Sequence, residues 1–233
     1  MCDHKVGRAM ALKLVIGNKN YSSWSMRPWI AMRAAGIPFE DAVIPLGEAD
    51  TKARIAEVSP AGKVPVLIDG DIHVWESLAI LEYLADKFPD AQLWPSDPRA
   101  RAHGRAIASE MHAGFVPLRG HCPMNMWRPV IKRELTPEVE ANVRRIDALW
   151  MECRARFGAG GPFLFGRFSA ADAMYAPVVA RFTTYAIDAG PESRAYMDAV
   201  RALPAYEEWK AAGIKETWLL AEDEVDWPKV LKA

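Results

Sequence analysis

The chain has 233 residues, of which 51% are hydrophobic and 25% charged, an ordinary balance for a globular protein with one large or two small domains. Its 29 basic and 30 acidic side chains give a net charge of −1, which argues against a general nucleic-acid binder or a binder of anionic membranes. Three cysteines without Cys-x-x-Cys spacing argue against a disulfide framework or a zinc site, and they favour a reducing, cytoplasmic location. No apolar run of about 18 residues predicts a membrane span.

The first elements alternate between strand and helix. Residues 1–9 lack the apolar core of a signal peptide and are expected to form a loose leader. Residues 11–17 alternate with period two and predict a strand. After a polar loop, a helix is expected from Ser25, the anticipated cap, to Gly36. Residues 39–46 then predict a second strand.

The next stretch predicts a short helix, a hairpin and a longer helix. Residues 51–58 favour the short helix, and the apolar, β-branched residues 64–68 favour a strand. Asp69-Gly70 is a hairpin signal, so residues 71–74 are expected to return antiparallel. Ser77 is the expected start of the longer helix. The predicted inner face of this helix is Leu78, Leu81, Leu84 and Phe88.

Residues 10–88 therefore predict a compact βαβαββα unit of the α/β class. Residues 88–98, rich in Pro and Asp, are the expected linker. Residues 99–233 contain no convincing strand and predict an all-α domain. Four segments favour helix: residues 99–118, 136–157, 171–190 and 204–216.

Four short stretches, in this order, carry a family resemblance. They are SSWSMRPWIAM (22–32), KVPVL (63–67), Glu76-Ser77 before a helix, and FSAADAMYAP (168–177). Together they resemble the glutathione S-transferase family over nearly the whole chain after the leader. The resemblance implies a thioredoxin-like N-terminal domain, a helical-bundle C-terminal domain and glutathione as cosubstrate. It also implies a homodimer that needs no metal.

The serine-rich stretch fits activation of the glutathione thiol. A thiolate is the nucleophile, and a hydroxyl donor beside a helix N-terminus stabilises that anion. In the serine-type tau, phi and zeta classes the catalytic hydroxyl lies five residues before the helix arginine. Counting back from Arg27 assigns this role to Ser22, with Ser23 as the runner-up. Tyr21 is a third alternative, because other classes use a tyrosine in this region.

The resemblance assigns further glutathione contacts to two stretches. Pro65 resembles the family's cis-proline, which would expose the Val64 backbone to pair with the cysteinyl part like an added strand. Lys63 is expected near the glycyl carboxylate. Glu76 suits the γ-glutamyl ammonium, and Ser77 at a helix N-terminus suits the adjoining carboxylate. The alternatives are an edge-strand proline, a loop lysine and a serine that only caps its helix.

The co-substrate side rests on a sulfur-rich and aromatic-rich stretch. Trp24 is expected to contact glutathione, and with Met111, His112 and Phe115 to form the electrophile pocket. Such residues also make core or subunit contacts. His112 and His121 have no metal-ligand spacing and are interpreted as solvated or satisfied histidines.

Three other features are interpreted as structural. Ser169 and Asp172 have the spacing of a helix capping box. Cys122 and Cys153 are expected to be inert packing residues. The acidic run at residues 222–226 is expected on the solvated surface.

The leading functional hypothesis is therefore a glutathione S-transferase that directs the glutathione thiolate at a small hydrophobic electrophile. The first alternative is a glutathione-dependent isomerase of the zeta, maleylacetoacetate isomerase type. Zeta enzymes carry cysteine where this chain has Trp24, which weakens that assignment. The second alternative is a non-catalytic, transferase-like binding protein, which retention on a glutathione resin would test.

Overall fold

The computed structural model describes residues 11–233, so the predicted leader lies outside the described residues. The strands form one sheet in the order β2-β1-β3-β4. Strands β1 and β2 are parallel, whereas β3 pairs antiparallel with both β1 and β4. The expected hairpin is present, with Gly70 at a φ of 65° in the turn. The strands are Leu12–Ile16 (β1), Phe39–Val43 (β2), Val66–Asp69 (β3) and Ile72–Trp75 (β4).

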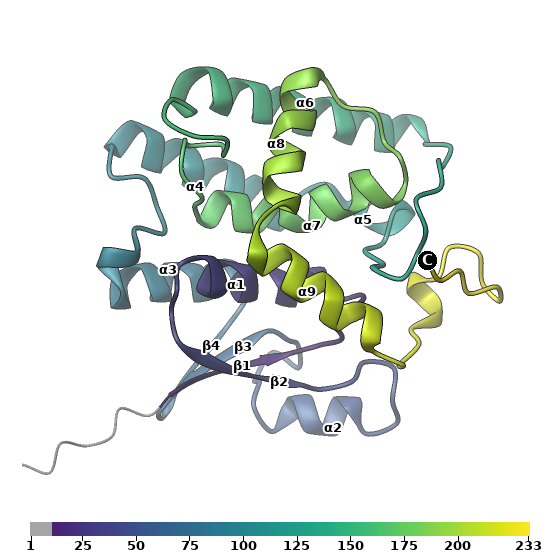
Figure 1. Ribbon diagram of the computed structural model, residues 1–233. Helices are drawn as coiled ribbons and strands as arrows, with labels where there is room; N and C mark the ends of the chain where they lie inside the picture. The colour runs from purple at the N-terminus through teal and green to yellow at the C-terminus, as the bar shows by residue number, and fades with distance from the viewer. Residues whose placement is uncertain (1–10) are drawn as a thin grey trace, which may run out of the picture.

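Three helices complete the predicted βαβαββα order, which is confirmed. Helices α1 (Ser23–Ala34) and α3 (Ser77–Lys87) lie between the sheet and the second half of the chain, and α2 (Thr51–Ala56) covers the opposite face (Figure 1). Beneath α2 a small apolar cluster joins the sheet to this helix. Its members are Val15, Ile44, Ile55 and Val66.

Helix α1 begins earlier than expected. The predicted cap Ser25 is wrong, because Ser22 is the N-cap and its hydroxyl accepts the Ser25 N–H at 3.4 Å. The Ser25 hydroxyl instead accepts the N–H of Gly17 at 3.0 Å, which ties the helix to the end of β1. The first turn of α1 is thus buried and held by two serine hydroxyls.

The inner face of α3 is rotated from the prediction. Ile80, Leu81 and Leu84 are buried, whereas Leu78 and Phe88 are only partly buried. Successive helical residues differ by about 100° in direction, so a stripe that begins at the buried Ser77 continues through residues 80, 81 and 84.

The second half is all-helical, as predicted, but three details differ. The helix expected over residues 171–190 ends at Thr184. The expected helix over residues 99–118 is broken where Phe115 adopts a φ of 57°. Helix α8 was not predicted, although four buried residues with i, i+3, i+4, i+7 spacing mark it. The helices are Pro98–Ala113 (α4), Val116–His121 (α5), Pro137–Phe157 (α6), Ala170–Thr184 (α7), Pro191–Arg201 (α8) and Pro204–Lys215 (α9), and the turns Pro89–Ala91 (η1) and Ala221–Asp223 (η2) are 3₁₀.

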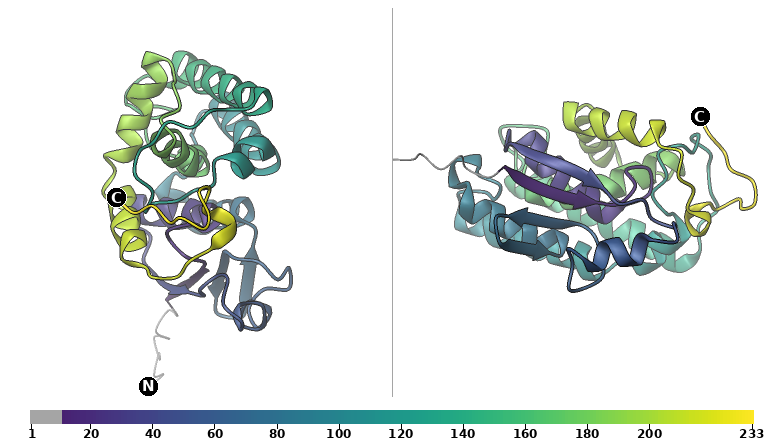
Figure 2. Two further views of the ribbon diagram at one scale, coloured as in Figure 1. Left: turned by 90° about the vertical axis from the view of Figure 1, so that its right-hand side faces the viewer. Right: turned by 90° about the horizontal axis from the view of Figure 1, so that it is seen from below.

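The two halves share one hydrophobic core, because α1 packs against both α7 and α9 (Figures 1 and 2). The predicted linker is also packed: the Leu93 carbonyl accepts the N–H of Ala170 at 2.7 Å. A capping box of Ser169 and Asp172 begins α7. No helix within residues 11–233 has the length and continuous hydrophobicity needed to cross a bilayer.

Candidate functional site

A cavity of about 720 Å³ lies where the two halves meet. Its walls come from the start of α1, the loop before β3, the start of α3, the α4–α5 region, α7 and the segment after α9. The polar and charged side chains on its walls are Tyr21, Ser22, Ser23, Trp24, Lys63, Glu76, His112, Arg119, Arg181, Glu222 and Asp223.

Both predicted serines line the cavity at the N-terminal end of α1. The hydroxyl oxygens of Ser22 and Ser25 are 2.8 Å apart, and either hydroxyl can rotate to donate. The Ser23 hydroxyl accepts a hydrogen bond from Nη2 of Arg181 at 3.2 Å. Ser22 therefore sits at the positive end of the helix with a serine partner behind it, whereas Ser23 is engaged by an arginine.

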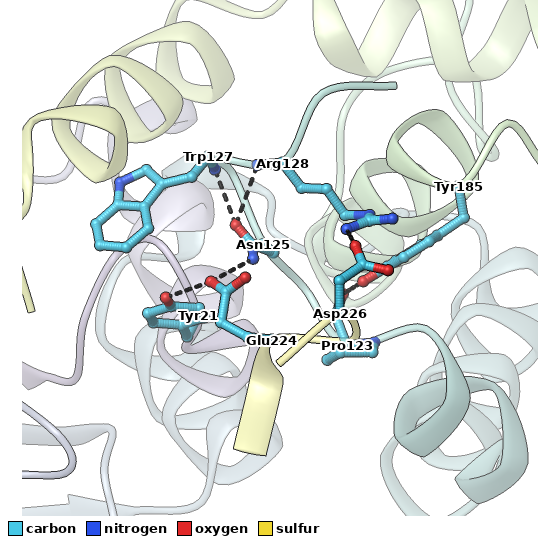
Figure 3. Close-up of polar contacts among 8 residues, drawn as sticks. All are labelled: Tyr21, Pro123, Asn125, Trp127, Arg128, Tyr185, Glu224 and Asp226. Carbon is cyan, nitrogen blue, oxygen red and sulfur yellow. Dashed lines mark hydrogen bonds and ion pairs between the residues drawn. The ribbon is translucent and has the colours of Figure 1, made fainter. Parts of the chain in front are cut away.

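Tyr21 is poorly suited to activate a ligand. Its hydroxyl donates to Oε1 of Glu224 at 2.6 Å (Figure 3). Burial, followed by this bond, raises the pKa of Tyr21. Glu224 is only 4% exposed, so the prediction of a solvated acidic run at residues 222–226 is wrong at this position. The run was misassigned because charge alone indicates a surface, and only the tertiary fold brings Tyr21 to it.

Lys63, Val64 and Pro65 line the wall before β3. The Val64–Pro65 peptide bond is cis, as the resemblance implied. Val64 precedes β3, and its N–H and C=O make no main-chain hydrogen bond within residues 11–233. An extended ligand can therefore pair with this backbone as an added strand.

The start of α3 forms the next part of the wall. Glu76 lines the cavity with a φ of 69° and a ψ of 123°, a conformation that non-glycine residues rarely adopt and that is often found at functional sites. Ser77 is fully buried behind Glu76, and its hydroxyl accepts from Nη1 of Arg27 at 3.4 Å. The Ser77 side chain does not line the open cavity.

Only half of the predicted electrophile pocket lines the cavity. Trp24 and His112 do so, with ring centroids 5.2 Å apart in an edge-to-face arrangement. Burial lowers the pKa of His112, whose Nε2 lies 3.5 Å from Oε2 of Glu76. Met111 and Phe115 pack into the hydrophobic core instead, and their prediction as pocket residues is wrong. Met111 precedes His112 by one residue, so it points about 100° away around α4.

Sequence reasoning missed three arginines. Arg119 and Arg181 line the cavity, and Arg27 is fully buried beside it. Their hydrogen-bond partners are hydroxyls and carbonyls rather than carboxylates. Burial, then the charges of Arg181 and Arg119, lowers the pKa of Arg27 to about 9. Arg119 and Arg181 stand in no short motif, so only the fold brings them beside Arg27.

Trp24 lies between two of these cations. The guanidinium carbons of Arg27 and Arg119 are 4.1 and 5.0 Å from its ring centroids. Such contacts stabilise the cations without neutralising them.

No cluster of three or more metal-ligating side chains occurs in the part of the chain that the structure describes. Cys122 and Cys153 are fully buried, and burial raises their pKa values to about 11 and about 12. Both thiols therefore act as packing groups.

Two family models match the chain. The glutathione S-transferase N-terminal domain matches residues 21–87, and the glutathione S-transferase C-terminal domain matches residues 136–212. These ranges include the start of α1, the loop before β3, the start of α3 and the capping box of α7.

Individual relatives and a solved structure agree with these family models. A probable maleylacetoacetate isomerase of Caenorhabditis elegans is 41% identical over 42% of this chain and 45% of that protein. Glutathione S-transferase Z2 of Arabidopsis thaliana is 26% identical over 81% of this chain and 88% of that protein. The theta class glutathione S-transferase of Xanthomonas axonopodis pv. citri, solved with glutathione bound, is 25% identical with a TM-score of 0.62, over 90% of this chain and 99% of that one.

Proposed function

The chain belongs to the glutathione S-transferase family, and we propose that it activates glutathione as a thiolate for attack on a small electrophile in the same cavity. The observation that carries this proposal is the position of Ser22, which caps α1 and lines the cavity. Its hydroxyl and the helix N-terminus act on the same ligand atom.

Thiol activation follows from simple electrostatics. A free thiol with a pKa of about 8.5 is mostly protonated at neutral pH. A hydroxyl donor and the positive end of a helix favour the anion by roughly 1–3 kcal/mol, or about one to two pKa units. The Ser25 hydroxyl can donate to Ser22, which frees the Ser22 proton for the sulfur.

The remaining contacts bind three different parts of glutathione. The Val64 backbone pairs with the cysteinyl part as an added strand. The Glu76 carboxylate binds the γ-glutamyl ammonium, and the N-terminus of α3 at Ser77, supported by Arg27, favours the neighbouring carboxylate. Lys63 approaches the glycyl carboxylate as a point charge. The thiolate then forms a carbon–sulfur bond with the electrophile as the leaving group departs.

A second candidate is glutathione-dependent isomerisation, in which the thiolate adds, a bond rotates and the thiolate leaves. The observation that favours it is the pair of arginines on the cavity wall, Arg119 and Arg181, which suit an electrophile that carries a carboxylate. Trp24 stands where zeta enzymes carry cysteine. Isomerisation of maleylacetoacetate far faster than any conjugation would favour this candidate.

The deciding experiment is a pH titration of bound glutathione, followed by thiolate absorbance, with wild type beside Ser22→Ala. We expect the bound thiol to ionise at least about one pKa unit below free glutathione in wild type only. An unshifted pKa in a complex that still binds glutathione would make the protein a binder rather than a catalyst. An equal shift in the variant would transfer the role to Ser23.

We further propose a cytoplasmic homodimer. The family expectation supports the dimer, and three cysteines without a disulfide pattern support a reducing compartment. Light scattering at micromolar concentration measures the oligomeric state directly, and a monomer at that concentration would contradict the proposed dimer.

A further inference from the structure

The segment after α9, residues 216–233, returns across the cavity. Leu220, Glu222 and Asp223 of this C-terminal segment line the cavity. Figure 1 shows it in yellow beside the loop that follows α5. Arg128 of that loop pairs with Asp226, and the Trp127 carbonyl accepts the N–H of Ala233 at 2.7 Å. The segment is therefore fixed to the body of the protein at several points.

One of its carboxylates holds the loop that precedes Ser22. Glu216 accepts the N–H of Lys19 through Oε1 at 2.8 Å and the N–H of Asn20 through Oε2 at 2.9 Å. Both carboxylate oxygens are used, one for each N–H. The Ser22 N–H in turn donates to the Asn18 carbonyl at 2.8 Å, so the same short loop sets the start of α1.

A second carboxylate holds the residue directly before Ser22. Oε1 of Glu224 accepts both the Tyr21 hydroxyl at 2.6 Å and Nδ2 of Asn125 at 2.8 Å (Figure 3). Oε2 of Glu224 is buried and has no partner within the described residues. Glu224 therefore ties the residue before Ser22 to the loop that carries Asn125.

We propose that Glu216 and Glu224 are positioning residues for thiol activation: the C-terminal segment holds residues 19–21 so that the Ser22 hydroxyl faces the glutathione sulfur. The two carboxylates, which lie about 200 residues later in the chain, accept three hydrogen bonds from residues 19–21. The inference rests on the proposed function, because it concerns the same hydroxyl. It adds a region that lies beyond both family-matched ranges.

The test uses the full-length chain with three test substitutions and one control substitution. Glu224→Ala removes the acceptor of Tyr21, whereas Glu224→Gln keeps one side-chain oxygen for both donors. Glu216→Gln leaves one of its two N–H groups without an acceptor. Glu207→Ala, an exposed carboxylate on α9, is the matched control. The readouts are the pKa and Kd of bound glutathione and the hydrogen exchange of residues 17–25.

We expect Glu224→Ala to lose at least half of the wild-type pKa shift, with faster exchange in residues 17–25 and a Kd within about threefold. Glu224→Gln restores the shift, Glu216→Gln loses part of it, and Glu207→Ala keeps it. If Glu224→Ala does not fold, Tyr21→Phe removes the same hydrogen bond while keeping the packed ring.

A folded Glu224→Ala or Tyr21→Phe protein with a wild-type thiol pKa overturns the inference and leaves the proposed function intact. A lower melting temperature with an unchanged thiol pKa does the same, since that is a purely structural role. A wild-type protein that shows no pKa shift overturns the proposed function first, and this inference with it.

Discussion

The two walls of the cavity have different origins. One, here called the glutathione wall, is built from short stretches within the first 80 residues; the other, the arginine wall, comes from α4, α5, α7 and the C-terminal segment. The glutathione wall comprises Ser22, Lys63, Val64, Pro65 and Glu76, and the arginine wall comprises His112, Arg119, Arg181, Glu222 and Asp223.

The walls differ in chemistry as well as in origin. The glutathione wall offers a hydroxyl, a free strand edge and one carboxylate, which suit a peptide. The arginine wall offers guanidinium groups with a neighbouring acid, Asp223, which suit a charged group of variable shape. Because the walls differ in this way, we expect that thiol activation and co-substrate choice can be altered separately, and substitutions can test that separation.

Ser22→Ala should break the glutathione wall with the largest effect. The hydroxyl supplies part of the combined effect of hydroxyl and helix end, so its loss should raise the pKa of the bound thiol by about one unit and slow conjugation at neutral pH by roughly tenfold. Glutathione affinity should change little, because the strand edge at Val64 remains. Thiolate absorbance and steady-state rates measure both quantities.

Ser23→Ala is the matched control. It removes the acceptor of Arg181 but leaves the Ser22–Ser25 pair intact, so it should keep the thiol pKa. Equal pKa shifts in the two variants would show that the serines act together rather than through Ser22.

Arg119→Met should break only the arginine wall. The methionine keeps apolar contact with Trp24 while removing a charge that rests 5.0 Å from its ring. A charge-assisted hydrogen bond of about 1.4 kcal/mol predicts a roughly tenfold higher KM for a carboxylate-bearing electrophile. Neutral electrophiles and glutathione should keep their KM values. A uniform loss for both classes of electrophile would contradict the division into two walls.

Asp223→Asn should change how the arginine wall responds to pH. Burial raises the pKa of Asp223 to about 6, while the charge of Arg181 lowers it and those of Glu222 and Glu224 raise it. Asp223 is therefore neutral below about pH 6 and anionic above it, where it competes for Arg181. The KM of a carboxylate-bearing electrophile should rise by about threefold as pH increases through 6, for a partly screened pair.

In Asp223→Asn this rise should disappear. The KM should stay at its low-pH value. The charge of His112 also affects the KM, but its pKa is lowered, so this histidine titrates at a more acidic pH. A pH profile that is identical in wild type and variant would remove Asp223 from the arginine wall.

The fold and the glutathione wall were largely predictable because their signals are local. The alternation in β1, the Asp69-Gly70 turn and the serines before Arg27 each lie within a few residues. The family resemblance placed Pro65 and Glu76 for the same reason. The errors there were small shifts along or around a helix, such as the cap at Ser25 instead of Ser22, since several neighbouring serines can cap.

The arginine wall was not predictable, because no short pattern describes it. Arg119 and Arg181 are 62 positions apart in the sequence, and Glu224 meets Tyr21 across 203 positions. Met111 was misplaced because composition does not fix the rotation of α4. The burial of Glu224 within the charged run at residues 222–226 depends on partners that only the tertiary fold supplies.

Ser169→Ala should have the smallest effect on the cavity, although both walls depend on the fold that this residue supports. The Asp172 carboxylate accepts the Ser169 N–H and hydroxyl, each at 2.8 Å, and the Leu164 N–H at 3.1 Å. Losing the cap hydroxyl should cost about 1–2 kcal/mol of folding free energy, a fall in Tm of roughly 2–8 °C.

Arg181 lies three turns further along α7, where its Nε donates to the Cys122 carbonyl at 2.9 Å, so it should stay in place once the helix has formed. Calorimetry beside glutathione titration therefore separates the two roles. We expect a lower Tm and an unchanged glutathione Kd and thiol pKa for Ser169→Ala. A binding defect at unchanged stability would mean that the start of α7 belongs to the ligand site rather than to the scaffold that carries Arg181.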